Sequence, residues 1–228
     1  MLQLGRLGRL FVLIGPVLAF VAGDAAAELK EGSDYVVISP AQPTGADTLK
    51  GIDTLKGINT KIEVTEFFWY GCPHCHAFEP ILSKWLKTLP KDVNFRRVPA
   101  DFGRWTAGVK LFYALDAMGE EQRLHGELFD AIHVERLNYL SESAVADWLS
   151  KEGVERRKFV DAYNSPNVKT STQRAQRISK DYGLKGVPAV VIGGKYLTSN
   201  VMAGGFEELL VVMDQLIAKL RAEQAMQK

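Results

Sequence analysis

The feature that most constrains this chain is a predicted buried strand that leads into a Cys-Pro-His-Cys motif and an amphipathic helix. Residues 61–70 (KIEVTEFFWY) are rich in β-branched and aromatic side chains, which predicts a central, buried strand. The motif Cys72-Pro-His-Cys75 follows almost at once. Beyond it, six apolar residues recur at the spacing of one helix face: Phe78, Ile81, Leu82, Trp85, Leu86 and Leu89. The two cysteines are therefore expected at a strand-to-helix junction.

The position of the motif gives its first cysteine the reactive role. If Cys72 is the N-cap, Pro73 takes the first helical position, where its missing N–H costs no hydrogen bond. The sulfur of Cys72 then faces the free N–H groups and the positive end of the helix dipole, which favour a thiolate. His74, as a cation or an N–H donor, stabilises that thiolate further. We therefore expect Cys72 to be the exposed nucleophile and Cys75 to be buried one turn along the helix.

Stabilisation of the thiolate also sets the direction of the redox chemistry. A stable Cys72 thiolate favours the reduced form of the Cys72–Cys75 pair, so the disulfide form becomes the stronger oxidant. The dipeptide Pro73-His74 between the cysteines therefore points to donation of a disulfide to other thiols.

Two other interpretations of the cysteine pair remain open. Half of a zinc site needs two more ligands, and the only four histidines of the chain have no matching spacing. We interpret His76, His125 and His133 as surface or packing residues. An inert structural disulfide is the other possibility, but it would close a ring too small to stabilise the fold much.

The first 27 residues have the layout of a cleaved signal peptide. Arg6 and Arg9 form a short basic region, residues 10–22 are an apolar run, and Ala25-Ala-Ala27 is a small-residue cleavage site. The alternative, an uncleaved membrane anchor, is disfavoured because the run is short for a bilayer. We expect export, with a mature chain that begins at Glu28.

After this leader, the order of strand and helix signals predicts an α/β fold. Strand signals occur at residues 35–38, 61–70, 93–98, 187–192 and 195–197. The last two flank Gly193-Gly194, a two-residue hairpin turn. From about residue 105 to residue 180 all signals are helical, and a final helix has an apolar face through Leu220. This order fits one sheet domain with a helical domain inserted in it.

A polar linker before the central strand contains a duplicated hexapeptide. Residues 47–52 (DTLKGI) recur at once as residues 53–58. Six residues match no helical period or solenoid unit, and two copies are too few for a repeat architecture. We interpret the duplication as a local event in a tolerant surface loop.

Two segments of the chain resemble the signatures of a known family. Residues 66–75 (EFFWYGCPHC) are similar to the active-site segment of the DsbA family of bacterial periplasmic disulfide oxidases. Gly186-Val-Pro188 is similar to that family's second signature, a valine followed by a cis proline that faces the active site. The resemblance covers nearly all of the mature chain.

The resemblance implies a thioredoxin-like fold with an inserted all-helical domain. Residues 28–104 and 178–228 are then the two parts of the thioredoxin-like domain. Residues 105–177 are the helical insertion, and residues 1–27 are the signal peptide.

The resemblance also implies roles for individual residues. The catalytic residues are Cys72, Pro73, His74, Cys75 and Glu66. Val187 and Pro188 bind substrate, with a cis bond that leaves the backbone of Val187 free to pair with an extended chain. From the residues alone, a trans proline at a strand start is favoured, since roughly 5–6% of X–Pro bonds are cis.

Glu66 is a carboxylate within an apolar strand. It shares one face of that strand with Val64 and Phe68, which suggests a buried position. If Glu66 is buried near the cysteines, its pKa is raised, and it can accept a proton from Cys75. The alternative is a solvated edge position.

The predicted reaction is disulfide donation. A thiol of an unfolded exported protein attacks Cys72, and a second substrate thiol resolves the mixed disulfide. The resemblance implies a periplasmic monomer that is reoxidised by a quinone-linked membrane partner of the DsbB type, with no soluble cofactor and no metal. The net charge of +1 gives no case for a nucleic-acid partner.

Two other functions remain open. A disulfide isomerase or reductase uses a similar motif, but such relatives usually carry a dimerisation segment, for which residues 28–57 are too short and polar. A metal-binding or chaperone-like module would use the same groove without turnover. A thiol count and a metal assay on purified protein separate these functions.

Overall fold

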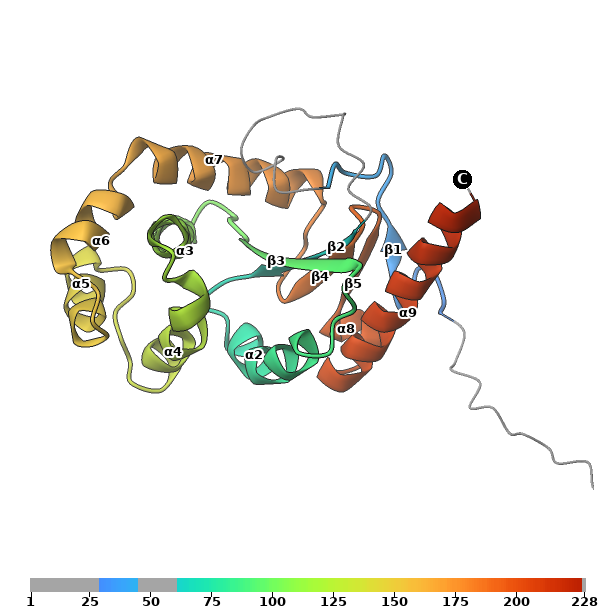
Figure 1. Cartoon of the computed structure of the whole chain (residues 1–228), viewed down its shortest axis with the longest axis horizontal. Helices are drawn as coiled ribbons and strands as arrows, with labels where there is room; N and C mark the ends of the chain where they lie inside the picture. The colour runs from blue at the N-terminus through green and yellow to red at the C-terminus, as the bar shows by residue number, and fades with distance from the viewer. Residues whose placement is uncertain (1–28, 45–60, 227–228) are drawn as a thin grey trace, which may run out of the picture.

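A computed structural model describes residues 29–44 and 61–226 of the chain (Figure 1). The strands are β1 (Val36–Val37), β2 (Ile62–Phe68), β3 (Val93–Pro99), β4 (Ala189–Ile192) and β5 (Tyr196–Ser199). The helices are α2 (Pro73–Leu86), α3 (Thr106–Met118), α4 (Glu121–His133), α5 (Glu142–Lys151), α6 (Arg156–Tyr163), α7 (Pro166–Asp181), α8 (Asn200–Ala203) and α9 (Phe206–Met226). The predicted signal peptide, residues 1–27, and the duplicated hexapeptide, residues 47–58, lie outside the described residues.

The strands form one mixed sheet in the order β1-β5-β4-β2-β3. Strand β2 pairs in parallel with β3, and the other neighbours are antiparallel. The strand that precedes the cysteines is therefore central, and all seven of its residues are buried. Its register places Glu66 beside Arg97 of β3 and Val190 of β4.

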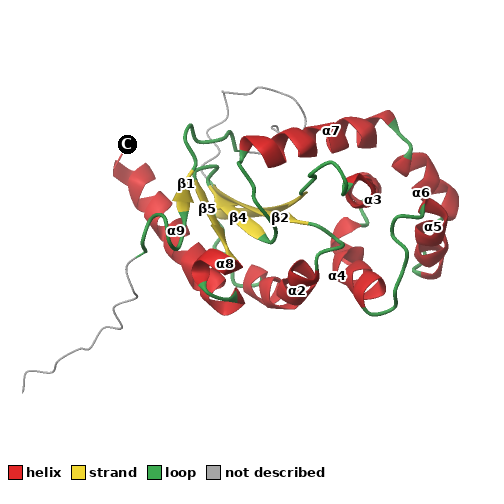
Figure 2. Ribbon diagram, turned by 180° about the vertical axis from the view of Figure 1, so that it is seen from behind, coloured by secondary structure: helices red, strands yellow, loops and turns green. Residues whose placement is uncertain are grey.

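Helices cover both faces of this sheet (Figure 2). On one face, Ile62 and Val64 of β2 pack with apolar residues of α2 and α9. On the other face, Phe67 packs with Tyr182 and other residues that follow α7. Side chains of alternating residues on β2 therefore enter two different cores, as the strand period requires.

Helices α3 to α7 lie between β3 and β4 in sequence and form the predicted helical insertion. A third core joins these helices to Phe68 and to both cysteines. Helix α5 begins with a capped first turn, in which the Ser141 hydroxyl accepts a hydrogen bond from the Ala144 N–H at 3.3 Å. The domain boundaries remain predictions, since α7 continues past residue 177 and Ile178 packs against the sheet.

The predicted hairpin at Gly193-Gly194 is confirmed. Both glycines have positive φ, 58° and 65°, as the predicted turn requires. The loop is one residue longer than predicted, because Ile192 pairs with Tyr196 and Lys195 also lies between the strands. A Cβ atom on Gly194 would collide with the carbonyl oxygen of Gln42. Strand β4 begins at Ala189, two residues later than predicted, because Pro188 has no N–H to give to the sheet.

A short helix follows the last strand of the sheet. The one-turn helix α8 was not predicted from the sequence; it begins where the Ser199 hydroxyl caps the N–H of Met202. Within residues 29–44 and 61–226, no helix combines the length and apolar character that crossing a bilayer requires.

Candidate active site

Cys72 lies where strand β2 ends and helix α2 begins. Its backbone is extended, with φ −90° and ψ 115°, so Cys72 is the N-cap and Pro73 takes the first helical position. The sulfur of Cys72 is therefore beside the free N–H groups of the first helical turn. Cys75 lies within that turn, and both cysteines are free thiols.

The two sulfurs differ strongly in acid strength. A hydrogen bond from Cys75, together with the backbone N–H groups of Cys75 and His74, lowers the pKa of Cys72 to about 6, although burial acts against it. The charge of the His74 imidazole lowers it further. Burial, followed by the interactions with Cys72, raises the pKa of Cys75 far above its usual range. At neutral pH Cys72 is therefore a thiolate, and Cys75 keeps its proton.

Cys72 is less accessible than expected, and the prediction of an exposed nucleophile is wrong. Its exposed fraction is 6%, against 1% for Cys75. The sulfur of Cys72 lies 3.5 Å from the carbonyl oxygen of Val187, 115 residues further along the chain. A long-range contact therefore covers the sulfur. Pro73 and His74, between the two cysteines, are exposed.

The second sequence signature lies against the first. The Val187–Pro188 peptide bond is cis, as the resemblance implied. Pro188 is buried and Val187 is half-buried. The fold therefore brings Val187, which precedes this cis proline, to the sulfur of Cys72. The role of Val187 and Pro188 in substrate binding stays a prediction.

Glu66 is 1% exposed, so the alternative of a solvated edge position is wrong. Burial is the largest cause that raises its pKa to about 7, with Arg97 opposing the rise and neighbouring carboxylates adding to it. The charge of Glu66 also contributes to the raised pKa of Cys75. The protonation states of Glu66 and Cys75 are therefore linked.

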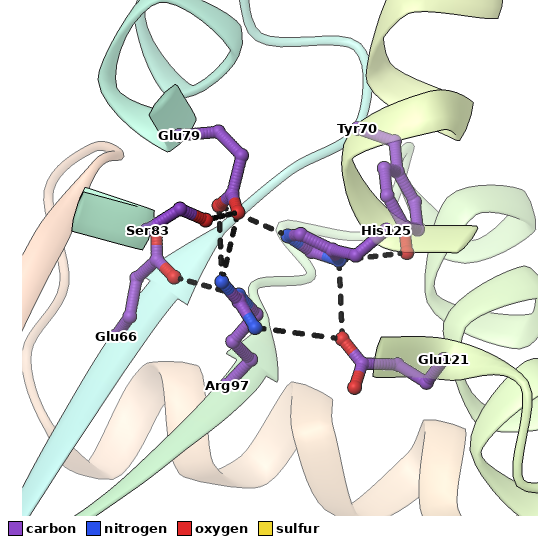
Figure 3. Close-up of polar contacts among 7 residues, drawn as sticks. All are labelled: Glu66, Tyr70, Glu79, Ser83, Arg97, Glu121 and His125. Carbon is purple, nitrogen blue, oxygen red and sulfur yellow. Dashed lines mark hydrogen bonds and ion pairs between the residues drawn. The ribbon is translucent and has the colours of Figure 1, made fainter. Parts of the chain in front are cut away.

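Charged side chains for which the sequence predicted no functional role surround Glu66. We call the group the buried cluster (Figure 3); its members are Glu66, Glu79, Arg97, Glu121 and His125. The guanidinium of Arg97 lies 3.2 Å from the carboxylate of Glu66 and 3.0 Å from that of Glu79. The imidazole of His125 lies 3.5 Å from Glu79 and 3.1 Å from Glu121.

A sequence signal for the buried cluster exists, although it is weak. Arg97 shares its strand face with Phe95, and His125 lies four residues before Phe129, on the same helix face. Charged residues at such apolar-face positions point to buried partners. His125 was interpreted as a surface or packing residue. Its side chain is 2% exposed, so it is a packing residue and does not lie at the surface.

The other two histidines beyond the motif stack on each other. The rings of His76 and His133 lie 4.8 Å apart, and His76 contacts the exposed carboxylate of Asp130 at 2.7 Å. In the part of the chain that the structure describes, no group of three or more His, Cys, Asp or Glu residues is placed to hold a metal ion.

Comparison with known proteins identifies the family. The family described as DSBA-like thioredoxin domain matches residues 63–211, which include the motif and Pro188. The chain belongs to this DsbA-like family. The thiol:disulfide interchange protein DsbA of Azotobacter vinelandii is 38% identical over 93% of this chain and 99% of that protein. The DsbA of Pseudomonas aeruginosa strain PAO1 is 44% identical over 71% of this chain and 77% of that protein.

Solved structures agree with this membership. A crystal structure of Pseudomonas aeruginosa DsbA has a TM-score of 0.76 at 40% identity, covering 86% of this chain and 96% of that chain. The oxidoreductase DsbA from Xylella fastidiosa has a TM-score of 0.75 at 31% identity, covering 85% and 98%. The DsbA-like assignment confirms the thioredoxin-like fold with its helical insertion. It also identifies the protein as a thiol:disulfide oxidoreductase.

The exposed histidine of the DsbA-like motif is expected to tune Cys72. Replacement of His74 with leucine should raise the pKa of Cys72 by less than about one unit, because the charge of an exposed imidazole is partly screened by solvent. The ultraviolet absorbance of the thiolate, followed against pH, measures this shift. His76→Leu serves as the matched control and should leave the titration unchanged. An unchanged titration in His74→Leu would show that the hydrogen bond from Cys75 and the backbone N–H groups stabilise the thiolate without the imidazole.

Proposed function

We propose that this DsbA-like protein is an oxidase that donates the Cys72–Cys75 disulfide to thiols of unfolded exported proteins. The proposal rests above all on the pKa of Cys72, which is about 6 while that of Cys75 is raised. Reduction of the disulfide then yields one stable thiolate, and a more stable reduced form makes the disulfide a stronger oxidant. A low pKa also makes Cys72 the better leaving group.

Disulfide transfer then takes two exchange steps. A substrate thiolate attacks the sulfur of Cys72, the Cys72–Cys75 bond breaks, and Cys75 leaves with the electron pair and takes up a proton. A second substrate thiolate attacks the substrate sulfur of the mixed disulfide, and Cys72 leaves as a thiolate. The substrate is oxidised, and the enzyme is reduced by two electrons. Cys75 keeps the proton that it took up, and both substrate protons enter the solvent.

Glu66 is the group that supplies the proton to Cys75. With its pKa at about 7, a large fraction of Glu66 is protonated at neutral pH. The Cys75 thiolate that forms in the first step is a far stronger base, because burial raises its pKa. The proton therefore moves from Glu66 to Cys75, and Glu66 then exchanges protons with solvent according to its pKa of about 7. The carboxylate form of Glu66 accepts the proton of Cys75 when Cys75 attacks during reoxidation.

Replacement of Glu66 with glutamine tests this role. We expect formation of the mixed disulfide to slow by about tenfold or more at neutral pH and to lose its pH dependence near pH 7, because glutamine transfers no proton. Rapid-mixing kinetics with a thiol peptide across pH measure both effects. Glu63→Gln is the matched control, since Glu63 is a buried carboxylate of the same strand. A pH profile that Glu66→Gln leaves unchanged would remove Glu66 from the mechanism.

Glu66→Gln also tests how the burial of Glu66 affects the stability of the fold. Burial raises the pKa of Glu66 from 4.5 to about 7, so the ionisation of Glu66 lowers the stability of the fold as pH rises between these values. Above pH 7, Glu66→Gln is therefore expected to be more stable than the wild type, by about 3 kcal/mol. Urea unfolding at pH 5 and pH 8 measures the difference, which should be small at the lower pH.

A groove beside Val187 provides space for the substrate. The cavity has a volume of about 650 Å³. Its apolar lining includes Val36, Val37, Leu184, Leu197, Val201 and Met202. Val201 is 84% exposed, so apolar surface is available at the rim. We propose that an extended substrate pairs with the backbone of Val187 and places apolar side chains in this groove.

We also propose that the protein works in the periplasm as a monomer without a soluble cofactor. A quinone-linked membrane oxidase of the DsbB type then restores the disulfide. Export requires cleavage after Ala27, and N-terminal sequencing of the exported protein should give Glu28 as the first residue. A mature protein that retains residues 10–22 would instead be anchored.

A further inference from the structure

We propose that His125 is a positioning residue for the disulfide exchange, because its positive charge lets the buried cluster hold one proton and places that proton on Glu66. The inference rests on the role proposed above for Glu66. His125 itself touches neither the cysteines nor the substrate, and it acts through the carboxylates that it contacts.

The surroundings of His125 favour its charged form. Its Nδ1 atom lies 3.1 Å from a carboxylate oxygen of Glu121 and 3.1 Å from the hydroxyl of Tyr70. Its Nε2 atom lies 3.5 Å from a carboxylate oxygen of Glu79 (Figure 3). Burial opposes the charged form, but the contacts with Glu121 and Glu79 outweigh it and raise the pKa of His125. A buried imidazole with an acid at each nitrogen is therefore an imidazolium.

The buried cluster has no net charge when one of its carboxyl groups carries a proton. Three carboxyl groups, those of Glu66, Glu79 and Glu121, face two cations, Arg97 and His125. The cluster is neutral when one carboxyl group is protonated, and a buried site favours the neutral state. Without the charge of His125, neutrality would need a second proton.

The contacts decide which carboxyl group carries the proton. Glu79 accepts hydrogen bonds from Arg97 at 3.0 Å and from the Ser83 hydroxyl at 2.7 Å. Despite burial, contacts with His125 and these groups lower the pKa of Glu79 to about 2. The carboxylate of Glu66 lies 3.2 Å from the guanidinium of Arg97, and its pKa is raised. Glu66 is therefore the carboxyl group that carries the proton.

The groups around Glu66 come from every neighbouring element. Arg97 lies on β3, the uncharged Val190 on β4, Cys75 and Glu79 on α2, and Glu121 and His125 on α4. A cavity of about 410 Å³ between α2 and α4 reaches Glu79, Arg97 and His125, and the exposed Asp130 lines its outer part. Water can therefore exchange protons with the cluster while a substrate covers Cys72.

Carbon NMR of the Glu66 carboxyl group across pH tests the proposal in the reduced full-length mature protein. His125→Gln removes a nearby positive charge and should raise the pKa of Glu66 by about one unit. The double variant His125→Gln/Glu121→Gln removes one charge of each sign and should return the pKa close to that of the wild type. His133→Gln, the same change on the same helix outside the buried cluster, is the matched control and should have no effect.

The outcomes separate this proposal from the function on which it rests. If His125→Gln leaves the titration of Glu66 unchanged while Glu66→Gln still alters the pH profile of exchange, the role of His125 is overturned and that of Glu66 stands. If Glu66→Gln leaves the pH profile unchanged, the proposed function of Glu66 fails. If His125→Gln changed the titration of Glu66 only by loosening the structure, the double variant would show a change at least as large. Should His125→Gln fail to fold, a double variant that also fails, or that titrates unlike the wild type, overturns the charge balance.

Discussion

Replacement of Cys72 with serine is expected to abolish disulfide transfer, whereas Cys75→Ser is expected to trap mixed disulfides on Cys72. Cys72 carries the thiolate, with a pKa of about 6, and a serine hydroxyl does not ionise at neutral pH. In Cys75→Ser, the Cys72 thiolate still attacks a disulfide-bonded substrate. The mixed disulfide then persists, because the sulfur that would displace the substrate is missing.

Non-reducing electrophoresis and mass spectrometry of the trapped species measure this difference. The double variant Cys72→Ser/Cys75→Ser is the control and should trap nothing, since the chain has two cysteines in all. Complexes that form through Cys75 in Cys72→Ser would show that the roles of the two sulfurs are reversed.

The second large effect is expected from Arg97→Met, which should lower the free energy of unfolding by about 3–5 kcal/mol at neutral pH. The side chain of Arg97 is 10% exposed and lies between the carboxylates of Glu66 and Glu79. Methionine has a similar length but no charge, so it leaves buried carboxylates with one cation fewer. Removal of one partner of a buried ion pair costs far more than the pair itself contributes.

Urea unfolding of Arg97→Met and of Arg221→Met provides the comparison. Arg221 also contacts a carboxylate, that of Asp92 at 2.8 Å, but both side chains are about half exposed, at 46% and 47%. An exposed pair contributes about 1 kcal/mol or less, so Arg221→Met should differ little from the wild type. Equal losses in the two variants would contradict the account of Arg97 as the centre of a buried charge cluster.

Local patterns predicted most of the fold, because each main element is determined by residues that lie close together in the sequence. The apolar run before Cys72 forms the central strand, and Gly193-Gly194 forms the hairpin turn. Each of these elements follows from a side-chain period or a turn preference that neighbouring residues determine.

The features of the active site that the sequence did not predict depend on long-range contacts. Cys72 was expected to be exposed, but Val187 covers its sulfur from 115 residues away. Arg97, Glu79 and His125 come from a strand and two helices, and their charges meet only in the folded chain. The raised pKa of Glu66 could be anticipated from its place in an apolar strand. Its value of about 7 depends on this cluster.

The reduction potential of the Cys72–Cys75 pair, measured by equilibration with glutathione, tests the central claim most directly. A stabilised Cys72 thiolate predicts an oxidising pair, with a potential above roughly −180 mV. DsbA is itself the reference for such oxidants, at about −120 mV, and the geometry at Cys72 predicts the direction of the shift toward that value. A potential near that of thioredoxin, about −270 mV, would contradict the account and identify the protein as a reductase.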